Sequence, residues 1–320
     1  MDTEAILERR RLRRRASFWR VAAIVILAVA IAGAVAFAWD LEGLDGRGHV
    51  AEIKIDGFIA TRPEAVKLID KAVEADSVKA ILLQIDSGGG AASGGEALYR
   101  SIRHAADKKP VVAVIDGVGA SAAYMAAIAA DRVVARETAI TGSIGVIFQY
   151  AHFEELLQKV GAKYEEIKSA PLKGEPSLFD APDPAAEAMV KAVVDDTYGW
   201  FVGIVAERRN LPIATTRRIA DGSIFTGRQA LERALIDQVG GVEEARAWLA
   251  SAKGVSKDIP AREWKKDQPF GSMFSSGAVA ALARLVGLDP VAVPILPQRL
   301  VVDGLLSVWQ APVVGGSSDR

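Results

Sequence analysis

From residue 50 onward, apolar and polar residues alternate along the chain with two different periods. Residues 50–57 alternate apolar and polar positions as a half-buried strand does, whereas residues 62–75 have the spacing of an amphipathic helix. Residues 78–86 form an almost continuous apolar run, which is typical of a strand covered on both faces. The same analysis predicts further strands at 110–116, 132–137 and 143–150, and helices around 93–106, 184–210, 212–220 and 226–234. This alternation predicts an α/β fold with a mostly parallel sheet and helices on both faces.

The predicted helix at 184–210 has residues at both ends that favour these boundaries. Asp183 is placed to cap its first turn, and Pro184 suits the first helical position. Pro212 follows the last predicted turn and cannot continue the helix. No internal repeat of 20–50 residues is present in the chain.

An uninterrupted apolar segment precedes the α/β pattern. Residues 21–38 carry no charge and lie between Trp19 and Trp39, a composition and length that suit a membrane-spanning helix of roughly 20 residues. Seven arginines against three acidic residues within 1–20 predict that the N-terminus is cytoplasmic.

We therefore predict a basic cytoplasmic N-terminus at 1–20, a transmembrane anchor at 21–39 and a short tether at 40–48. The alternative is a cleaved signal peptide, because Ala36-Phe37-Ala38 resembles a cleavage site. The apolar run, however, exceeds the roughly 7–15 residues of a signal-peptide core.

The composition of the chain excludes some kinds of catalysis and some binding partners. The chain has no cysteine, which excludes thiol catalysis, cysteine-ligated metals and disulfides. Its formal net charge of −1 argues against a general nucleic-acid binder.

Two small-residue segments follow predicted strands. In DSGGGAASGGE (86–96), the glycines after the strand leave backbone N–H groups able to bind a phosphate or a developing oxyanion. The spacing fits neither a Walker loop nor a dinucleotide-binding loop, and an ordinary tight turn is the alternative. In DGVGASAAYMAAIAA (116–130), Ser121 stands at a strand–helix junction, either as a helix cap or as a nucleophile.

A nucleophilic serine needs a partner that removes its proton. The chain has three histidines; His49 lies at the tether, His104 on a predicted exposed helix face, and His152 at the start of an acidic helical pattern. A lysine in apolar surroundings can also lose its proton near neutral pH, because burial penalises the charged form. Lys173 has mainly apolar neighbours, whereas Lys168 lies in a more polar run.

Five segments in order resemble the signal peptide peptidase A family, also called protease IV: DSGGG (86–90), GVGASAAYMAA (117–127), TGSIGV (141–146), KSAPLKGEPSLF (168–179) and DGSIFTGRQALERALIDQVGG (221–241). The resemblance implies that Ser121 is the nucleophile and Lys173 the general base. It also implies that Ser143 orients the lysine, and that the Gly89 and Ala122 N–H groups form the oxyanion hole.

The chain departs from the family pattern at three positions. Gly88 stands where the family has proline, and Ala122 and Ala123 replace two glycines. The two added methyl groups are expected to narrow the cleft beside the nucleophile, although no functional group is lost.

The resemblance also implies a fold and an assembly. The fold is that of the Clp protease and crotonase, with repeated ββα units, over a peptidase domain at 49–253. A single motif set resembles the short form of the family, which assembles as a homo-oligomeric ring. Lys173 would then act on a neighbouring subunit's serine. No cofactor and no metal are implied.

The implied activity is serine endopeptidase cleavage of signal-peptide remnants, with peptides and membrane lipid as partners and no nucleic acid. The implied location is the bacterial inner membrane, with the catalytic domain in the periplasm. Two alternatives are a crotonase-type acyl-CoA enzyme and a membrane-anchored, non-enzymatic peptide-binding scaffold. The extension at 254–320 is expected to pack on a neighbouring subunit or the membrane surface, or to occupy a cleft and be trimmed.

Overall fold

The computed structural model describes residues 19–21, 24–25, 27–29, 31–33, 48–181, 183–265 and 306–308. The chain forms two compact units, Met1–Arg47 and Gly48–Arg320. In the first unit, the described residues are helical and exposed. Within the described part of the chain, no helix is both long and apolar enough to span a bilayer. Much of the anchor predicted at 21–39, and nearly all of its flanks, lies outside the described residues, so the anchor stays a prediction.

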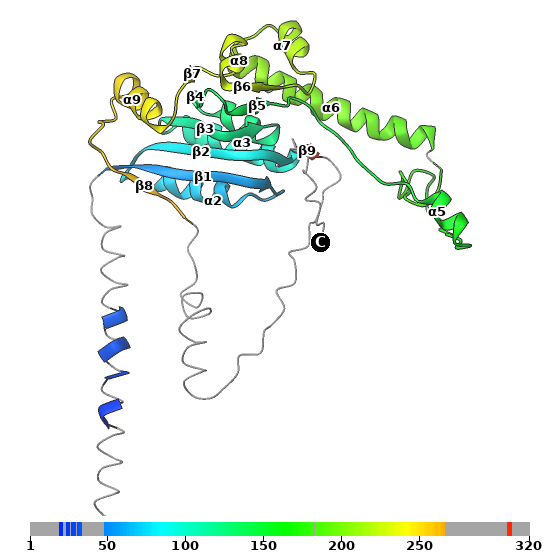
Figure 1. The fold of residues 1–320 in the computed structure, drawn as a ribbon, viewed down its shortest axis with the longest axis horizontal. Helices are drawn as coiled ribbons and strands as arrows, with labels where there is room; N and C mark the ends of the chain where they lie inside the picture. The colour runs from blue at the N-terminus through cyan, green and yellow to red at the C-terminus, as the bar shows by residue number, and fades with distance from the viewer. Residues whose placement is uncertain are drawn as a thin grey trace, which may run out of the picture. The chain divides into compact units, whose positions relative to one another are not determined.

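The second unit contains the predicted alternation of strands and helices (Figure 1). In chain order its elements are β1 (His49–Ile59), α2 (Glu64–Glu74), β2 (Val78–Ala91), α3 (Ala92–Ala106), β3 (Val111–Ala120), α4 (Ala122–Ala129), β4 (Arg132–Ala135), β5 (Ile140–Gly142), α5 (Glu154–Lys159), α6 (Pro184–Arg209), α7 (Ile213–Ile219), β6 (Ile224–Thr226), α8 (Gly227–Glu232), β7 (Gln238–Val239), α9 (Val242–Lys253), β8 (Ala261–Glu263) and β9 (Leu306–Val308).

One sheet joins all of the described strands. Its main order is β6-β5-β3-β2-β1-β8, and β4 joins β3 to β7. The pairs along β8, β1, β2, β3, β4 and β7 are parallel, as is the pair between β3 and β5. Only the pairs β5–β6 and β2–β9 are antiparallel within the described residues. The predicted mostly parallel α/β sheet is confirmed, whereas its assignment to the Clp protease and crotonase fold stays a prediction.

Helices cover both faces of this sheet, as its apolar strands require. In β2, Ile81 and Leu83 belong to the core beneath α2, α3, α4 and α6, whereas Ala80 and Leu82 face α9. All four side chains are fully buried. A strand whose two faces are both buried has no polar alternation, which explains the continuous apolar run in the sequence.

Two sequence predictions have different outcomes. The helix at 184–210 is confirmed as α6: Asp183 accepts a hydrogen bond from the Ala185 N–H at 2.8 Å, and Asn210 ends the helix with a φ of 51°. The strand at 143–150 is wrong, because β5 ends at Gly142 and only residue 147 forms an isolated bridge. Gly142 and Ser143 have φ values of 89° and 50°, which turn the chain out of the extended conformation.

A partly buried ion pair holds the end of α6 to the sheet. Arg209 Nη2 lies 2.8 Å and Nη1 3.1 Å from the two carboxylate oxygens of Asp237, and one of these oxygens accepts the Val133 N–H at 2.7 Å. Burial by itself would raise the pKa of Asp237, but the hydrogen bonds and charge of Arg209, with the Val133 N–H, lower it overall. The Arg209 side chain is only 9% exposed.

We predict that Asp237→Asn lowers the free energy of unfolding by about 3 kcal/mol at pH 7, because it leaves a buried guanidinium without its counter-charge. The lowered pKa of Asp237 means that its contribution is complete above the ordinary value of 3.8 and is lost as the pH falls through the folded value. Urea unfolding should therefore show that the free energies of unfolding of wild type and variant differ less at pH 3 than at pH 7.

Asp195→Asn is the matched control. Asp195 forms an exposed pair with Lys191 one turn away on α6, and such pairs contribute roughly 0.5 kcal/mol. Equal losses in the two variants would contradict the structural role of Asp237.

Candidate active site

Ser121 is the single residue between the end of β3 and the start of α4. Its backbone has φ 57° and ψ −121°, a combination that is strained for a residue with a side chain. The Ser121 N–H donates a hydrogen bond to the Gly142 carbonyl at 2.9 Å, and the residue is 1% exposed. Strain of this kind persists only where the surroundings enforce it, and it occurs often at functional sites.

Strand register brings three of the predicted site residues to one edge of the sheet. Ala120 pairs with Gly142, so Ser121 and Ser143 directly follow paired positions on parallel strands. Ser87 pairs with Gly119, and Gly89 and Ser121 lie two residues beyond that pair. The carboxyl ends of parallel strands are the usual place for a binding site in α/β folds. The structure therefore places the Ser121, Ser143 and Gly89 segments together.

The N–H groups of Ala122 and Gly89, the two predicted oxyanion donors, differ in the hydrogen bonds that they make in the structure. The Ala122 N–H is in the first turn of α4, where helical N–H groups have no intrahelical acceptor, and no described residue supplies one. The Gly89 N–H instead donates to Ser87 Oγ at 3.1 Å, and that hydroxyl donates to the Gly57 carbonyl. Ala122 thus offers an N–H donor at the positive end of a helix. The Gly89 N–H could bind an oxyanion only if it left the Ser87 hydroxyl or donated to both acceptors.

The methyl group of Ala122 points into the core. A Cβ atom built on Gly95 of α3 would lie 2.9 Å from the Ala122 Cβ and 2.7 Å from Met125 Sδ. Ala123 is also completely buried. The two alanines were expected to narrow the cleft, but the methyl group of Ala122 packs against α3, where Gly95 provides the room, and Ala123 lies in the core. A glycine inside a helical pattern was the sequence signal for this close contact.

Lys173 lies apart from these residues in the single chain. Residues 143–183, which we call the arm, connect β5 to α6 and carry α5, and Figure 1 shows them leading away from the sheet. Lys173 is exposed, and no hydrogen bond or ion pair within the described residues joins its side chain to Ser121 or Ser143. One chain therefore presents the predicted nucleophile and the predicted base in different places.

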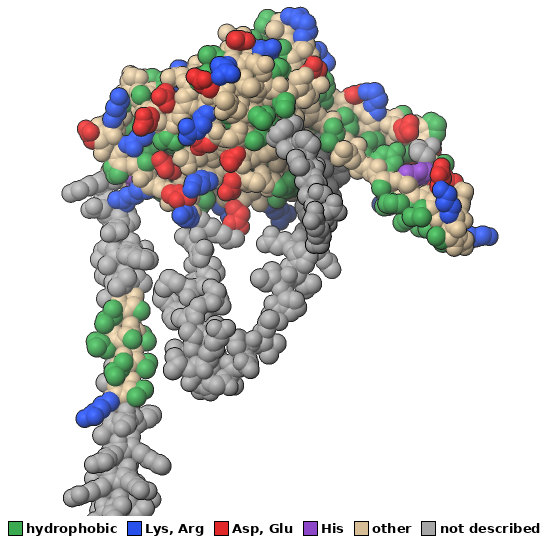
Figure 2. Space-filling model, viewed as in Figure 1, with side chains coloured by type: hydrophobic (Ala, Val, Ile, Leu, Met, Phe, Trp, Pro, Cys, Tyr) green, Lys and Arg blue, Asp and Glu red, His purple; other side chains and the backbone are tan. Residues whose placement is uncertain are grey.

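The arm is rich in exposed apolar side chains (Figure 2). They include Ile147, Tyr150, Phe153, Leu156, Val160, Tyr164, Ile167, Leu172 and Leu178. A monomeric soluble surface rarely exposes so many large apolar side chains in one segment, and such patches mark interaction surfaces.

Lys168 is unsuited to act as the base. Its ammonium group forms hydrogen bonds and ion pairs with Glu166 and Glu175. These contacts, that with Glu166 first, raise the pKa of Lys168, and the same lysine lowers the pKa of Glu175. The positive charge of Lys168 is thus stabilised.

None of the three histidines approaches Ser121 in the structure. His49 starts β1, at the opposite end of the parallel strands, and accepts a hydrogen bond from Trp264 Nε1 at 3.1 Å. His104 is exposed on α3, and His152 on the arm contacts the Asp180 carbonyl and Glu154. Among the described residues, no group of three acidic or histidine side chains could hold a metal ion.

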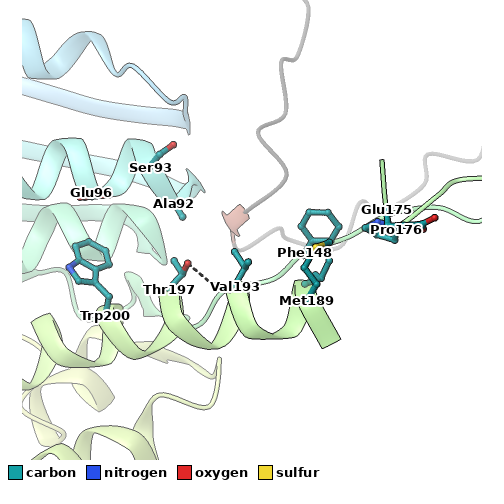
Figure 3. Close-up of a pocket in the computed structure, with 11 residues that line it drawn as sticks. Ala92, Ser93, Glu96, Phe148, Glu175, Pro176, Met189, Val193, Thr197 and Trp200 are labelled. Atoms are coloured by element: carbon teal, nitrogen blue, oxygen red, sulfur yellow. Dashed lines mark hydrogen bonds between the residues drawn. The ribbon is translucent and has the colours of Figure 1, made fainter. Parts of the chain in front are cut away.

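A mainly apolar cavity of about 530 Å³ adjoins the start of α3. Figure 3 shows Thr197, Val193 and Trp200 along α6, Ala92 and Ser93 at the start of α3, and Phe148 and Pro176 from the arm. Because Ala92 directly follows β2 and is three residues beyond Gly89, the cavity lies close to this predicted oxyanion donor.

Comparison with known proteins shows the family to which the chain belongs. The family model for peptidase family S49 matches residues 103–256. A Synechocystis sp. protein that carries a protease name is 38% identical over 214 residues, covering 66% of this chain and 77% of that protein. The chain belongs to peptidase family S49.

Two further relatives also carry peptidase or protease names. An Enterococcus faecium protein that carries a signal peptide peptidase name is 32% identical over 66% of this chain and 62% of its own length. The Arabidopsis thaliana chloroplastic serine protease SPPA is 33% identical over 83% of this chain and 41% of its own length. The predicted resemblance to the signal peptide peptidase A family is confirmed.

A weaker likeness comes from a solved structure. The 1510-N membrane-bound stomatin-specific protease aligns with a TM-score of 0.45 and 15% identity, covering 69% of this chain and 99% of that one.

We predict that Ser121→Gly and Ser121→Ala both abolish peptide hydrolysis but differ in stability. Glycine adopts the backbone conformation of residue 121 without the steric cost, so Ser121→Gly should be the more stable variant by about 1 kcal/mol. Urea unfolding compares the two variants, and equal stabilities would show that the backbone at this position is not strained.

Gly95→Ala should lower the free energy of unfolding by about 1–3 kcal/mol, because its methyl group would overlap Ala122 and Met125. Activity should fall as well, since α4 carries the Ala122 N–H. The double variant Gly95→Ala, Ala122→Gly should recover part of both losses. Thermal unfolding and peptide hydrolysis provide the two measurements, and no recovery in the double variant would refute the contact between residues 95 and 122.

Proposed function

We propose that this peptidase is a membrane-anchored serine endopeptidase in which Ser121 is the nucleophile and Lys173 of a neighbouring subunit is the general base. The observation that carries the proposal is the strained backbone of Ser121 at a strand–helix junction, followed by an Ala122 N–H without an acceptor among the described residues. This arrangement presents a hydroxyl and an oxyanion donor together.

In the proposed reaction, the neutral Lys173 amine takes the Ser121 proton while Oγ attacks the peptide carbonyl carbon. The Ala122 N–H, joined by that of Gly89, stabilises the oxyanion, each donor contributing about 2.7–4 kcal/mol to lowering the barrier. The intermediate then expels the amine, which takes the proton back from Lys173. Water attacks the acyl ester with the lysine again as base, releasing the acid and free Ser121.

Assembly supplies the base in this proposal. Lys173 is exposed on an arm with many exposed apolar side chains, and association of like subunits would cover both. Removing the amine from water favours its neutral form, which is the form that accepts a proton. In the proposed site, Ser143 accepts a hydrogen bond from an amine brought to Ser121; its position directly after Gly142, the partner of Ala120, supports this role.

The proposed substrates are apolar peptides, in particular signal-peptide remnants left in the membrane. The cavity beside α3 is lined by Ala92, Met189, Val193 and Trp200, which suit apolar side chains. A segment at 21–39 that anchors the chain in the bacterial inner membrane would hold the peptidase unit on the periplasmic side, near such remnants.

A mixing experiment tests the shared site. Ser121→Ala and Lys173→Ala chains should each be inactive, and co-expressed in equal amounts they should give about a quarter of wild-type activity, because a closed ring pairs each serine with one neighbour's lysine. Hydrolysis of a fluorogenic apolar peptide measures the recovery. If both residues of a dyad belong to one chain, mixing restores nothing.

Lys163→Ala is the matched control, since Lys163 is an exposed lysine on the same arm and makes no ion pair with any described residue. It should retain wild-type activity alone and in mixtures. Full activity of the Lys173→Ala chain by itself would show that Lys173 is not the general base.

A further inference from the structure

An open, polar cavity of about 540 Å³ lies beneath α9, and we call it the α9 cavity. Its lining includes Arg132, the first residue of β4, and Gln238 of β7. Arg132 is opposite Val112, near the start of the parallel strand β3, whereas Ser121 follows the end of β3. The α9 cavity is therefore at the amino-terminal end of the strands, opposite the predicted active site. Figure 1 shows α9 at the end of the sheet from which the strand arrows start.

The side chains of α9 explain why there is room for this cavity. Leu249 is buried in the core against the sheet. Trp248 and Ser251, three positions apart, line the cavity from one side of the helix. Ala247 and Ala250 also line it, with side chains too short to fill it. Among the described strands, β7 is two residues long and pairs with β4 alone, so no further described strand covers this edge.

The guanidinium group of Arg132 is only partly satisfied by the described residues. Its Nη2 atom donates a hydrogen bond to Gln238 Oε1 at 3.0 Å, and its Cζ atom lies 5.8 Å from the centre of the Trp248 ring. Its Nε atom is buried and has no hydrogen-bond partner among the described residues. A buried charged donor without an acceptor is unfavourable, so this group is suited to a ligand that brings negatively charged oxygen atoms.

The acidic side chains that flank this group in the fold bind other cations. Asp131 forms an ion pair with Lys253 at 3.3 Å, and Asp237 bonds Arg209 through both of its carboxylate oxygens. Neither aspartate forms an ion pair with Arg132. The described part of the chain therefore places no counter-charge in contact with Arg132.

Lys257 adds a second cation to the lining. It lies in the loop after α9, and Arg246 holds this loop by donating from Nη2 to the carbonyls of Lys257 at 2.8 Å and Ile259 at 2.6 Å. Glu244 is the one carboxylate among the described residues that line the cavity, and it accepts the Gly241 N–H at 2.7 Å in the first turn of α9. Two cations against one carboxylate give the lining a net positive charge.

We propose that the α9 cavity binds a phosphate group, held by Arg132 and Lys257 beside the Trp248 ring. A guanidinium group offers its donors in a planar fork, and an ammonium group adds a point charge from another direction. This combination matches the several oxygens and the charge of a phosphate better than the single charge of a carboxylate. The Ser251 hydroxyl supplies a further hydrogen-bonding group. The site goes beyond the proposed peptidase function and involves neither Ser121 nor Lys173.

Two sources supply such a group, namely free phosphate and the headgroup of a phospholipid. Strand β1 starts at the same end of the sheet as the α9 cavity. The chain reaches β1 from the predicted membrane segment through residues 40–48, which span at most about 30 Å. Under that prediction, lipid headgroups are a source of phosphate beside the free ion.

Isothermal titration of inorganic phosphate into the full-length chain, in neutral detergent at pH 7 and constant ionic strength, tests the proposal. We expect saturable binding with a Kd on the order of 1 mM. Arg132→Met, which keeps an aliphatic side chain beside Trp248, and Lys257→Ala should each weaken binding about tenfold, because each removes one cation. Arg228→Gln removes an exposed cation from α8 and is the matched control, with the affinity of wild type.

Absence of saturable binding by wild type, or undiminished affinity in either cavity variant, would overturn the proposal. Because Lys257 is exposed, Lys257→Ala decides the question even if Arg132→Met folds poorly. Thermal unfolding gives a second readout: phosphate should raise the Tm of wild type and of Arg228→Gln, and leave that of Lys257→Ala nearly unchanged.

Glycerophosphoglycerol, the soluble headgroup of phosphatidylglycerol, distinguishes the two sources. Affinity at least equal to that of inorganic phosphate, and weakened by the same two substitutions, would assign the site to a lipid headgroup. Binding of inorganic phosphate without binding of this diester would assign it to the free ion. Failure of both probes to bind contradicts the proposal and leaves the proposed peptidase function unaffected.

Discussion

The separation of β3 from β2 after Gly119 is the constraint on which the site depends. Up to that point the two strands are ordinary parallel neighbours in the middle of a sheet. Beyond it, β3 pairs with β5, and the Gly142 carbonyl accepts the N–H of Ser121 in its strained conformation. The same separation aligns Ser143 beside Ser121 and leaves an edge of β2 for another strand. Three local features thus follow from one change of partner.

Close packing around α4 supports this arrangement at Ser121. Helix α4 is buried on every side, and its fully buried Tyr124 donates a hydrogen bond to the Leu235 carbonyl at 2.7 Å. Burial raises the pKa of Tyr124, so the phenol stays neutral and remains a donor. Gly95 lets α3 approach the first turn of α4, and the methyl group of Ala122 fills that contact. Because such interiors are densely packed, a small volume change there would reach the backbone of Ser121.

Much of the fold was predictable because its signals are local. The continuous apolar run of β2 and the end signals of α6 depend on neighbouring residues, and both elements begin where the sequence placed them. Strand β2, however, continues to Ala91 through the glycines that were predicted to form a turn after residue 86. The segment 143–150 has an apolar sequence too, but within it only Ile144 is fully buried in the core, whereas Ile147 and Tyr150 are exposed on the arm. Hydrophobicity alone does not distinguish a core strand from an exposed apolar surface. The short strands β7 and β8 give too few residues for a periodic pattern. The closeness of Ser121, Ser143 and Gly89 follows from strand register, which the sequence suggested only through the family motifs.

The position of Lys173 on the arm has a consequence for the life of a newly made chain. Under the proposed mechanism, a subunit that has folded but has not yet met another copy contains a nucleophile without a base. Such a subunit could be synthesised without damaging the proteins around it, and that protection would require no separate pro-segment or dedicated inhibitor. Proteolysis would then begin only where subunits accumulate, so that local abundance, more than folding, sets when and where cleavage starts.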